Sequence, residues 1–136
     1  MKASINQTEL ARALGVVLKG VAKNSTLPVL VGVHILADQD TVTLQSTNLE
    51  LSIRYSLPAL VEEPGEAVLP GKLFTDIVKS LPDAAVHLAV EDTTALITCE
   101  NASFSVKGLD PYDFPAFPSV ETKKCARIPF EVFARM

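Results

Sequence analysis

The 136-residue sequence predicts an α+β domain in which two helices pack on one face of antiparallel sheet. Two segments carry apolar residues at helical spacing, and the segments between them alternate apolar and polar residues as half-buried strands do. These elements occur twice in the same order, which is a strand, a helix and three strands. The two halves share little sequence identity, so the repeat is one of pattern.

The first half has a clear helix start. Residues 6–9 resemble a capping box, in which the Asn6 side chain accepts from the Glu9 amide and the Glu9 side chain reaches back. Pro28 closes the segment that follows the helix. The expected elements are a strand over 2–5, a helix over 7–22 and strands over 29–37, 41–47 and 49–57. Alternation in the last strand places four apolar residues on one face: Leu49, Leu51, Ile53 and Tyr55.

The second half repeats this order after a turn at residues 62–65. Pro70 and Gly71 introduce its helix, and Pro82 and Asp83 end it. The expected elements are a strand over 67–69, a helix over 72–81 and strands over 86–91, 95–99 and 103–107. Two consecutive halves of this kind predict a single domain.

The character of the chain changes after Gly108. Residues 109–118 are rich in proline and aromatic side chains, which excludes a regular helix or a central strand and predicts an extended connector. A new strand over 124–128 and a new helix over 129–136 are expected to follow. We therefore expect one domain over 1–118, followed over 119–136 by a connector and the truncated start of a second domain. The chain would then be a piece of a longer protein.

Composition and charge exclude several classes of protein. The net charge of −4 excludes a basic protein that coats nucleic acid. The sequence contains neither a long apolar run nor a signal peptide, and its two cysteines form neither a disulfide framework nor a zinc motif. We expect a cytoplasmic protein without a metal ion or a cofactor.

Positive charge is concentrated on the two expected helices. On an ideal helix Arg12, Lys19 and Lys23 fall on one side of the first helix, and Lys72 and Lys79 fall on one side of the second. The two helical segments carry a net +3, so the remaining chain must carry −7. An ordinary solvated helix face is the simpler interpretation, but repetition on both helices favours contact with phosphate groups. Because these faces carry no side-chain pair suited to reading bases, that contact would not depend on sequence.

No catalytic motif is recognisable. His34 and His87 lie within expected strands, where a histidine is usually structural, and Asp110 and Asp113 lie in the connector, where aspartate commonly caps turns. A small-molecule-binding or enzymatic α+β domain that uses Asp110, Asp113 or His87 remains the alternative, and it requires a pocket in which these groups converge. A generic protein-interaction module is a third possibility.

Four motifs together carry a family resemblance. They are residues 26–30 (Thr-Leu-Pro-Val-Leu), 46–51 (Ser-Thr-Asn-Leu-Glu-Leu), 69–74 (Leu-Pro-Gly-Lys-Leu-Phe) and 109–115 (Leu-Asp-Pro-Tyr-Asp-Phe-Pro). In this order and at this spacing, the chain from Met1 to about Pro118 resembles the N-terminal domain of the bacterial DNA polymerase III beta subunit family, the replication sliding clamps. Each motif alone would be weak.

The resemblance implies a DNA clamp fold and a processivity factor without catalytic residues of its own. Three such domains would form a subunit, and two subunits would close head to tail into a homodimer ring around duplex DNA. The ring would tether the replicative polymerase, and polymerase and clamp loader would bind later domains that these residues do not include.

The resemblance also implies particular site residues. The DNA-facing positions would be Arg12, Lys19, Lys23, Asn24, Lys72 and Lys79. Many members carry a basic residue at the position of Asn24, so here Lys23 would take over that contact. The strand over 103–107 matches the edge that pairs with the other subunit, where Phe104 and Val106 would enter the interface. Ordinary core packing is the alternative for these two side chains.

Overall fold

A computed structural model describes residues 1–23 and 28–115. The described elements, in chain order, are β1 (Lys2–Asn6), α1 (Gln7–Val17), the 3₁₀ turns η1 (Leu18–Gly20) and η2 (Pro28–Val31), β2 (Gly32–Asp38), β3 (Thr41–Thr47), β4 (Ser52–Pro58), β5 (Leu60–Glu63), β6 (Gly65–Pro70), α2 (Gly71–Ser80), β7 (Ala85–Glu91), β8 (Thr94–Cys99), β9 (Ala102–Lys107) and the 3₁₀ turn η3 (Pro111–Asp113). The strand and helix expected over 124–136 and the DNA-facing position Asn24 lie outside the described residues.

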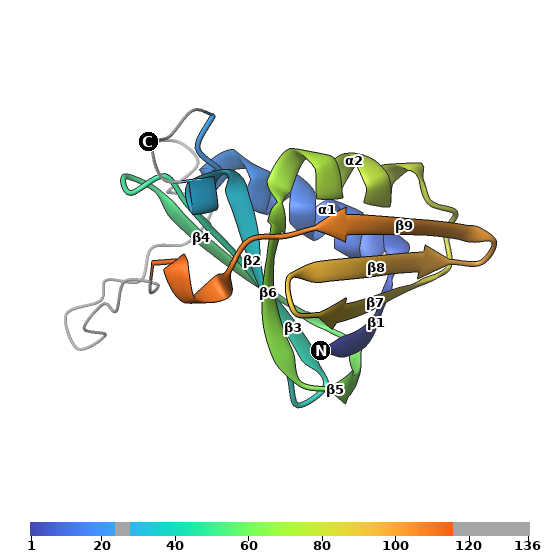
Figure 1. The fold of residues 1–136 in the computed structure, drawn as a ribbon. Coiled ribbons are helices and arrows are strands. Elements are labelled where there is room, and N and C mark those ends of the chain that lie inside the picture. The colour runs from blue at the N-terminus through green and yellow to red at the C-terminus, as the bar shows by residue number, and fades with distance from the viewer. Residues whose placement is uncertain (24–27, 116–136) are drawn as a thin grey trace, which may run out of the picture.

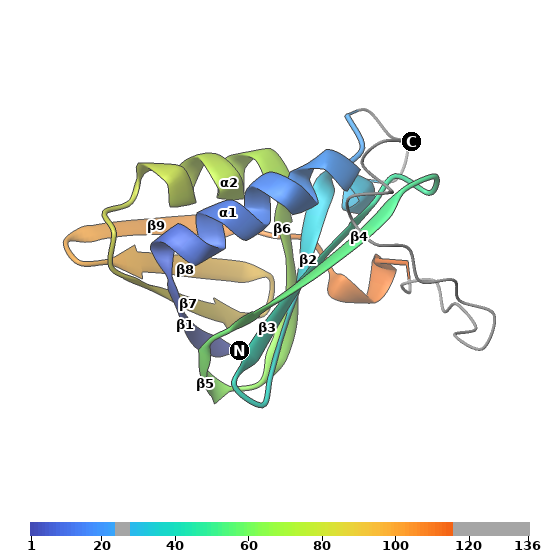
Figure 2. The same ribbon diagram turned by 180° about the vertical axis from the view of Figure 1, so that it is seen from behind.

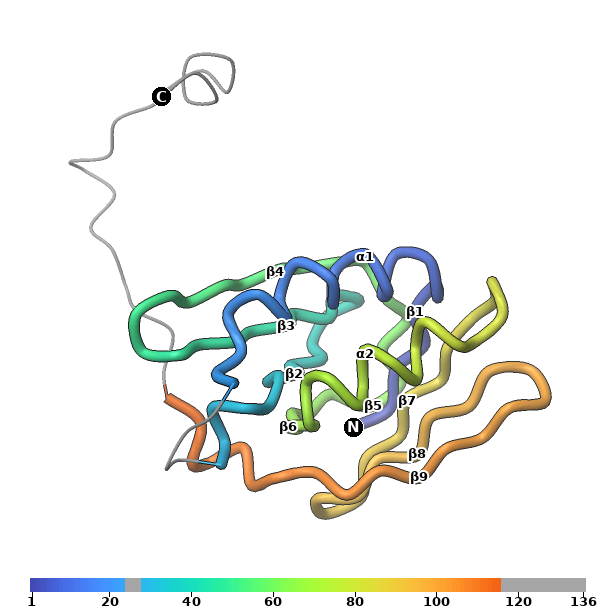
Figure 3. The backbone as a smooth tube through the Cα atoms, turned by 90° about the horizontal axis from the view of Figure 1, so that it is seen from above, coloured from blue at the N-terminus to red at the C-terminus, as the bar shows by residue number. Residues whose placement is uncertain are grey.

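The strands form two antiparallel sheets, and the two helices lie on the same side of both. One sheet has the order β4-β3-β2-β6, and the other has the order β5-β1-β7-β8-β9 (Figure 1). Seen from behind and from above, α1 and α2 run side by side over the two sheets (Figures 2 and 3). The α+β class and the helix-on-sheet arrangement predicted from the sequence are therefore confirmed.

The two halves of the chain exchange their first strands. β6 opens the second half but pairs with β2 of the first, with Ile35 opposite Ala67. β1 opens the first half but pairs with β7 of the second, with Ser4 opposite His87. β5 directly follows β4 in the chain and pairs with β1, so this part of the chain crosses from one sheet to the other. Each sheet therefore contains strands from both halves.

The core lies between the helices and the inner faces of the two sheets. Its largest fully buried side chains include Phe74 from α2, Leu14 from α1, Ile35 from β2 and Leu88 from β7. Each of these elements contributes an apolar stripe with the period of its own secondary structure. No helix in the described part of the chain is long and apolar enough to cross a membrane.

The first helix is shorter than its apolar pattern predicts. The start is as expected, because Asn6 Oδ1 accepts from the Glu9 amide at 3.2 Å. The prediction that the helix extends to residue 22 is wrong, because α1 ends at Val17 and only one 3₁₀ turn follows. At this end the Ser46 hydroxyl donates to the Val17 carbonyl at 2.6 Å, so a side chain from β3 replaces the next helical bond.

Two strands begin later than predicted, and one strand was missed. Residues 28–31 form the turn η2, so the second strand begins at Gly32 and not at residue 29. Residues 48–51 form a loop, so Leu49 and Leu51 are exposed and do not share a strand face with Ile53 and Tyr55. β5 occupies residues that the sequence assigns partly to a turn.

Candidate nucleic-acid interface

Both helices turn a charged face away from the core. In α1 the buried residues are Gln7, Leu10, Ala13, Leu14 and Val17. In α2 they are Gly71, Phe74, Thr75, Ile77 and Val78. Arg12 on α1 and Lys72, Asp76 and Lys79 on α2 are consequently exposed, and Lys19 is exposed on η1. The predicted orientation of both helices is correct.

A groove of about 590 Å³ lies between the end of the first helical segment and α2. Four lysines contribute to its lining: Lys19, Lys23, Lys72 and Lys79. The remaining lining residues are Leu18, Val21, Ala22, Val31, Thr75 and Asp76. The structure therefore gathers, around one groove, lysines from two segments about fifty residues apart in the sequence.

Close backbone packing holds the two sides of this groove together. Gly71 begins α2, and a Cβ atom there would lie 3.1 Å from Val21, 3.2 Å from Val33 and 3.3 Å from Leu18. The side containing Lys19 and Lys23 is fixed by two backbone bonds, Val21 N to Leu18 O at 3.1 Å and Ala22 N to Leu30 O at 3.0 Å. The backbone on both sides of the groove is thus positioned before any ligand arrives.

The charge of the groove is mainly positive. Asp76 is its one acidic lining residue, against four lysines. Within the described residues, no ion pair is found between Asp76 and a lysine. Four exposed lysines around one groove attract anions, and their exposure to water makes that attraction sensitive to salt.

A second groove, of about 580 Å³, adjoins the first because both include Lys19, Val21, Ala22 and Lys23 in their linings. Its far wall is the loop tip of Asn48, Leu49 and Glu50. The Asn48 side chain accepts from the Glu50 amide at 2.9 Å and the Leu51 amide at 2.7 Å, which fixes the tip. No sequence pattern predicted a binding role for this tip.

The remaining DNA-facing candidate among the described residues is Arg12. It is exposed on α1 but is not part of the lining of either groove. It therefore extends the positive face along α1 and does not belong to the four-lysine cluster.

Phe104 and Val106 lie on β9, at the edge of the five-stranded sheet. Val106 is 5% exposed and belongs to the core, and Phe104 is partly buried and packs against it. Core packing within this domain accounts for the burial of Val106, and Phe104 keeps a part that this packing does not cover. The exposed side chains of β9 are Ser103, Ser105 and Lys107.

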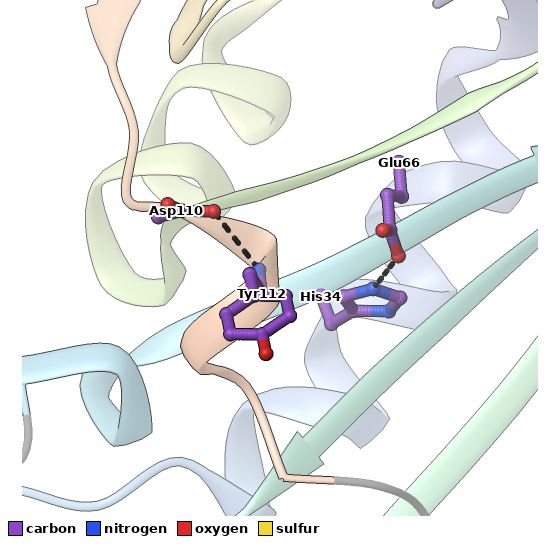
Figure 4. Close-up of polar contacts among 4 residues, drawn as sticks. All are labelled: His34, Glu66, Asp110 and Tyr112. Atoms are coloured by element: carbon purple, nitrogen blue, oxygen red, sulfur yellow. Dashed lines mark hydrogen bonds and ion pairs between the residues drawn. The ribbon is translucent and has the colours of Figure 1, made fainter.

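The structure does not bring together the residues of the enzymatic alternative. The His87 ring is on β7 and hydrogen-bonds with the Ser4 hydroxyl at 2.7 Å. Asp110 accepts from the Tyr112 amide at 3.0 Å, so its carboxylate caps η3 (Figure 4). The shallow groove of about 160 Å³ beside His87 includes neither Asp110 nor Asp113. Among the described residues no group of three or more histidine, cysteine or acidic side chains is arranged to hold a metal ion.

Lysines from two distant segments line one preformed groove, and such a cluster of positive charge attracts anions. The family to which the chain belongs follows from comparison with known proteins. Residues 1–118 match the family described as the DNA polymerase III beta subunit, N-terminal domain. The chain belongs to this family.

Individual relatives agree with this assignment. The chain is 34% identical over 135 residues to the beta sliding clamp homolog GriR of Streptomyces muensis, covering 99% of this chain and 36% of the relative. It is 30% identical over 145 residues to the beta sliding clamp of Bacillus subtilis, covering 100% of this chain and 38% of the relative. The chain thus spans little more than a third of the length of these relatives.

A solved structure confirms the fold. The DNA polymerase sliding clamp from Bacillus subtilis superimposes with a TM-score of 0.85 and 32% sequence identity, covering 89% of this chain and 34% of that one. The DNA clamp fold predicted from the four sequence motifs is therefore confirmed.

Proposed function

We propose that this chain is the N-terminal domain of a bacterial replication sliding clamp, and that its four-lysine groove faces duplex DNA. The observation that supports this most directly is the convergence of Lys19, Lys23, Lys72 and Lys79 on one groove of a family member's helical face. The groove serves as a contact for backbone phosphates and not as an active site. The protein works in the cytoplasm as a processivity factor for the replicative polymerase.

The mechanism is topological. A closed ring cannot leave a circular duplex, so individual contacts with DNA can be weak and can exchange as the ring slides. Exposed lysines suit this task because phosphate contacts of this kind carry no sequence information and weaken as salt increases. The acidic remainder of the chain discourages binding of DNA elsewhere on the molecule.

The ring itself requires parts that this chain does not contain. We propose that β9 supplies one side of the head-to-tail contact between two subunits, because it is an edge strand with backbone groups free to pair. Phe104 would contribute from the partly buried side of that edge, whereas Val106 would support it from the core. Polymerase and clamp loader would bind later domains.

The first experiment measures DNA binding by the 136-residue chain itself. We expect a labelled 30-base-pair duplex, titrated at low salt, to shift the backbone amide NMR signals of residues 18–23 and 71–79, with a weak affinity that falls as salt increases. Lys19→Glu combined with Lys79→Glu should abolish these shifts. Lys2→Glu combined with Lys107→Glu changes the net charge equally but lies outside both lysine grooves, and it should leave them in place.

Tight binding that persists at moderate salt, or equal loss in both double variants, would contradict the proposed contact. The second experiment uses the full-length clamp that contains these residues, loaded by its clamp loader onto nicked circular DNA. We expect the protein to stay on circles and to be lost when the circle is cut. Equal retention on both forms would mean that contacts, and not topology, hold the protein.

A further inference from the structure

The outer face of the four-stranded sheet carries a second apolar cluster, separate from the main core. Val29, Leu30 and Val68 are buried there, with exposed fractions of 5%, 3% and 0%. The partly buried residues packed against them are Ala22, Leu109 and Phe114. Two of those three belong to the segment after β9, so the connector covers apolar surface on the side of the sheet opposite the helices.

Backbone bonds fix the beginning of this segment to the sheet. The Gly108 amide donates to Thr93 O at 2.6 Å, and the Leu109 amide donates to Val68 O at 2.8 Å. Residue 108 must be glycine here, because a Cβ atom would clash with Val68 O and would lie 2.9 Å from Thr93 O. The connector is therefore tied to β6 as soon as it leaves β9.

The far end of the segment is held by a histidine. The His34 ring stacks on Phe114 with centroids 5.2 Å apart and an angle of 27° between the planes. His34 Nε2 lies 2.8 Å from Glu66 Oε2, which fixes the orientation of the ring (Figure 4). No group among the described residues hydrogen-bonds with the buried His34 Nδ1. The ring is thus held by one polar contact and by its flat face against Phe114.

We propose that residues 109–115 form a strap that closes over the outer face of the four-stranded sheet, and that His34 is the positioning residue that holds its aromatic end. Between its two attachments the strap is short and stiff, because Pro111 opens η3 and Asp110 caps it. The closed strap fixes the point at which the chain leaves this domain.

If the strap opened, residues 109–115 could extend away from the sheet. Seven released residues span up to about 23 Å when extended, at roughly 3.3 Å per residue. Opening would also expose Val68 and Leu30 to water. The strap has few apolar contacts and a single short turn, so it is the kind of element that opens before the rest of a domain. Closure by His34 therefore decides whether residues 109–115 stay on the sheet or extend away from it.

Amide hydrogen exchange on the 136-residue chain, resolved by NMR, tests the strap directly. His34→Ala should accelerate exchange at Leu109 and Phe114 by about 3- to 10-fold, the fold-change that loss of one aromatic pair implies. Amides of β8 should be unchanged. Leu36→Ala is the matched control, because Leu36 is on the same strand and the same outer face but outside the cluster.

Two further variants keep the test decisive if His34→Ala perturbs the whole domain. His34→Phe keeps a flat ring against Phe114 but loses the bond to Glu66, and it should retain most of the protection. Phe114→Ala should accelerate the same amides, and combining it with His34→Ala should add little further. Unchanged exchange in His34→Ala, equal acceleration in Leu36→Ala, or fully additive effects of the His34 and Phe114 changes would overturn the proposal.

Discussion

Leu49 adopts an unusual backbone conformation for a large apolar side chain. Its φ is 76°, in the left-handed region, and its side chain is 65% exposed. The Leu49 amide donates to Thr47 Oγ1 at 3.0 Å, and Asn48 binds the two amides that follow. These bonds hold the backbone in a conformation that the Leu49 side chain disfavours. The strain lies beside Lys19 and Lys23, at the second groove.

Leu49→Gly should therefore stabilise the domain. Glycine adopts positive φ without a steric penalty, so we expect a gain of about 1 kcal/mol in the free energy of unfolding, measured by urea denaturation. The neighbouring exposed residue Leu51 has no positive φ, and Leu51→Gly should instead destabilise the domain. A loss of stability in Leu49→Gly that matches Leu51→Gly would contradict this account.

Cys99 is a protonated thiol at neutral pH. Burial raises the pKa of its thiol above 9.0, and the charge of Glu100 adds to that effect. Cys99 Sγ also donates to the Pro82 carbonyl at 3.6 Å. Because only the thiolate is a good nucleophile, Cys99 should react with a disulfide reagent only when the domain opens.

The raised pKa of Cys99 makes the stability of the domain decrease at high pH. The thiol ionises more readily in the unfolded chain, so its contribution to stability is complete below about pH 9 and is lost as the pH rises through the folded-state pKa. The domain that carries Cys99→Ala should therefore lose less stability above pH 9 than the domain with Cys99.

Thiol labelling tests the burial of Cys99. In a Cys125→Ser background we expect slow labelling at pH 8 that accelerates in denaturant. Rapid labelling of the folded chain would contradict burial as the cause.

At the scale of single elements, Gly15 and Gly108 differ in the space around them, so adding a Cβ atom should affect stability differently at each. Gly15 lies within α1, and a Cβ atom there would meet nothing within 4 Å. Gly108 lies where the chain leaves β9, between the carbonyl groups of Val68 and Thr93. Neither glycine has a positive φ, so space and backbone entropy, not the left-handed region, determine the outcome.

The same substitution should consequently have opposite effects at the two positions. Gly15→Ala should stabilise the domain by about 0.5–1 kcal/mol, because alanine loses less backbone entropy in a helix. Gly108→Ala should destabilise it by about 1–3 kcal/mol, because backbone atoms must move to admit the Cβ. Thermal unfolding of both variants measures the difference. A neutral Gly108→Ala would show that the connector accommodates the methyl group by shifting.

At the scale of the whole molecule, neither half of the chain completes a sheet alone. Residues 1–63 lack β6, which forms one edge of the four-stranded sheet, and they supply β1 and β5 to a sheet whose other strands come later. Leu69 of β6 and Leu88 of β7 also belong to the same core as Ile35 and Leu14. The two halves are therefore expected to fold only together.

A chain divided between Pro64 and Gly65 tests this dependence. Each fragment alone should give a poorly dispersed amide spectrum and no cooperative unfolding, because its apolar faces lack a partner. Mixing the fragments should restore the dispersed spectrum of the intact domain. Cooperative unfolding of fragment 1–64 alone would show that the exchanged strands are dispensable.

Much of the candidate site was predictable from helical periodicity. Arg12, Lys19, Lys72 and Lys79 were placed on outward faces, since a helix that buries an apolar stripe must expose the opposite side. Their gathering around one groove was not predictable, because it depends on how closely α2 approaches η1 at Gly71. The strained tip at Leu49 was also missed. Leu49 and Leu51 continue the apolar alternation of the strand that follows, so the pattern alone does not separate the tip from the strand.

The sequence by itself determined the class of fold, the order of both helices and of every strand except β5, and the family, because periodicity and local motifs are properties of neighbouring residues. The tertiary structure decided the end of α1 at Ser46, the exchange of first strands between the halves, the inward direction of Val106 and the contact of Phe114 with His34. Each of these joins residues far apart in the chain. Such contacts depend on which surfaces meet once the core has formed, and no local pattern records that choice.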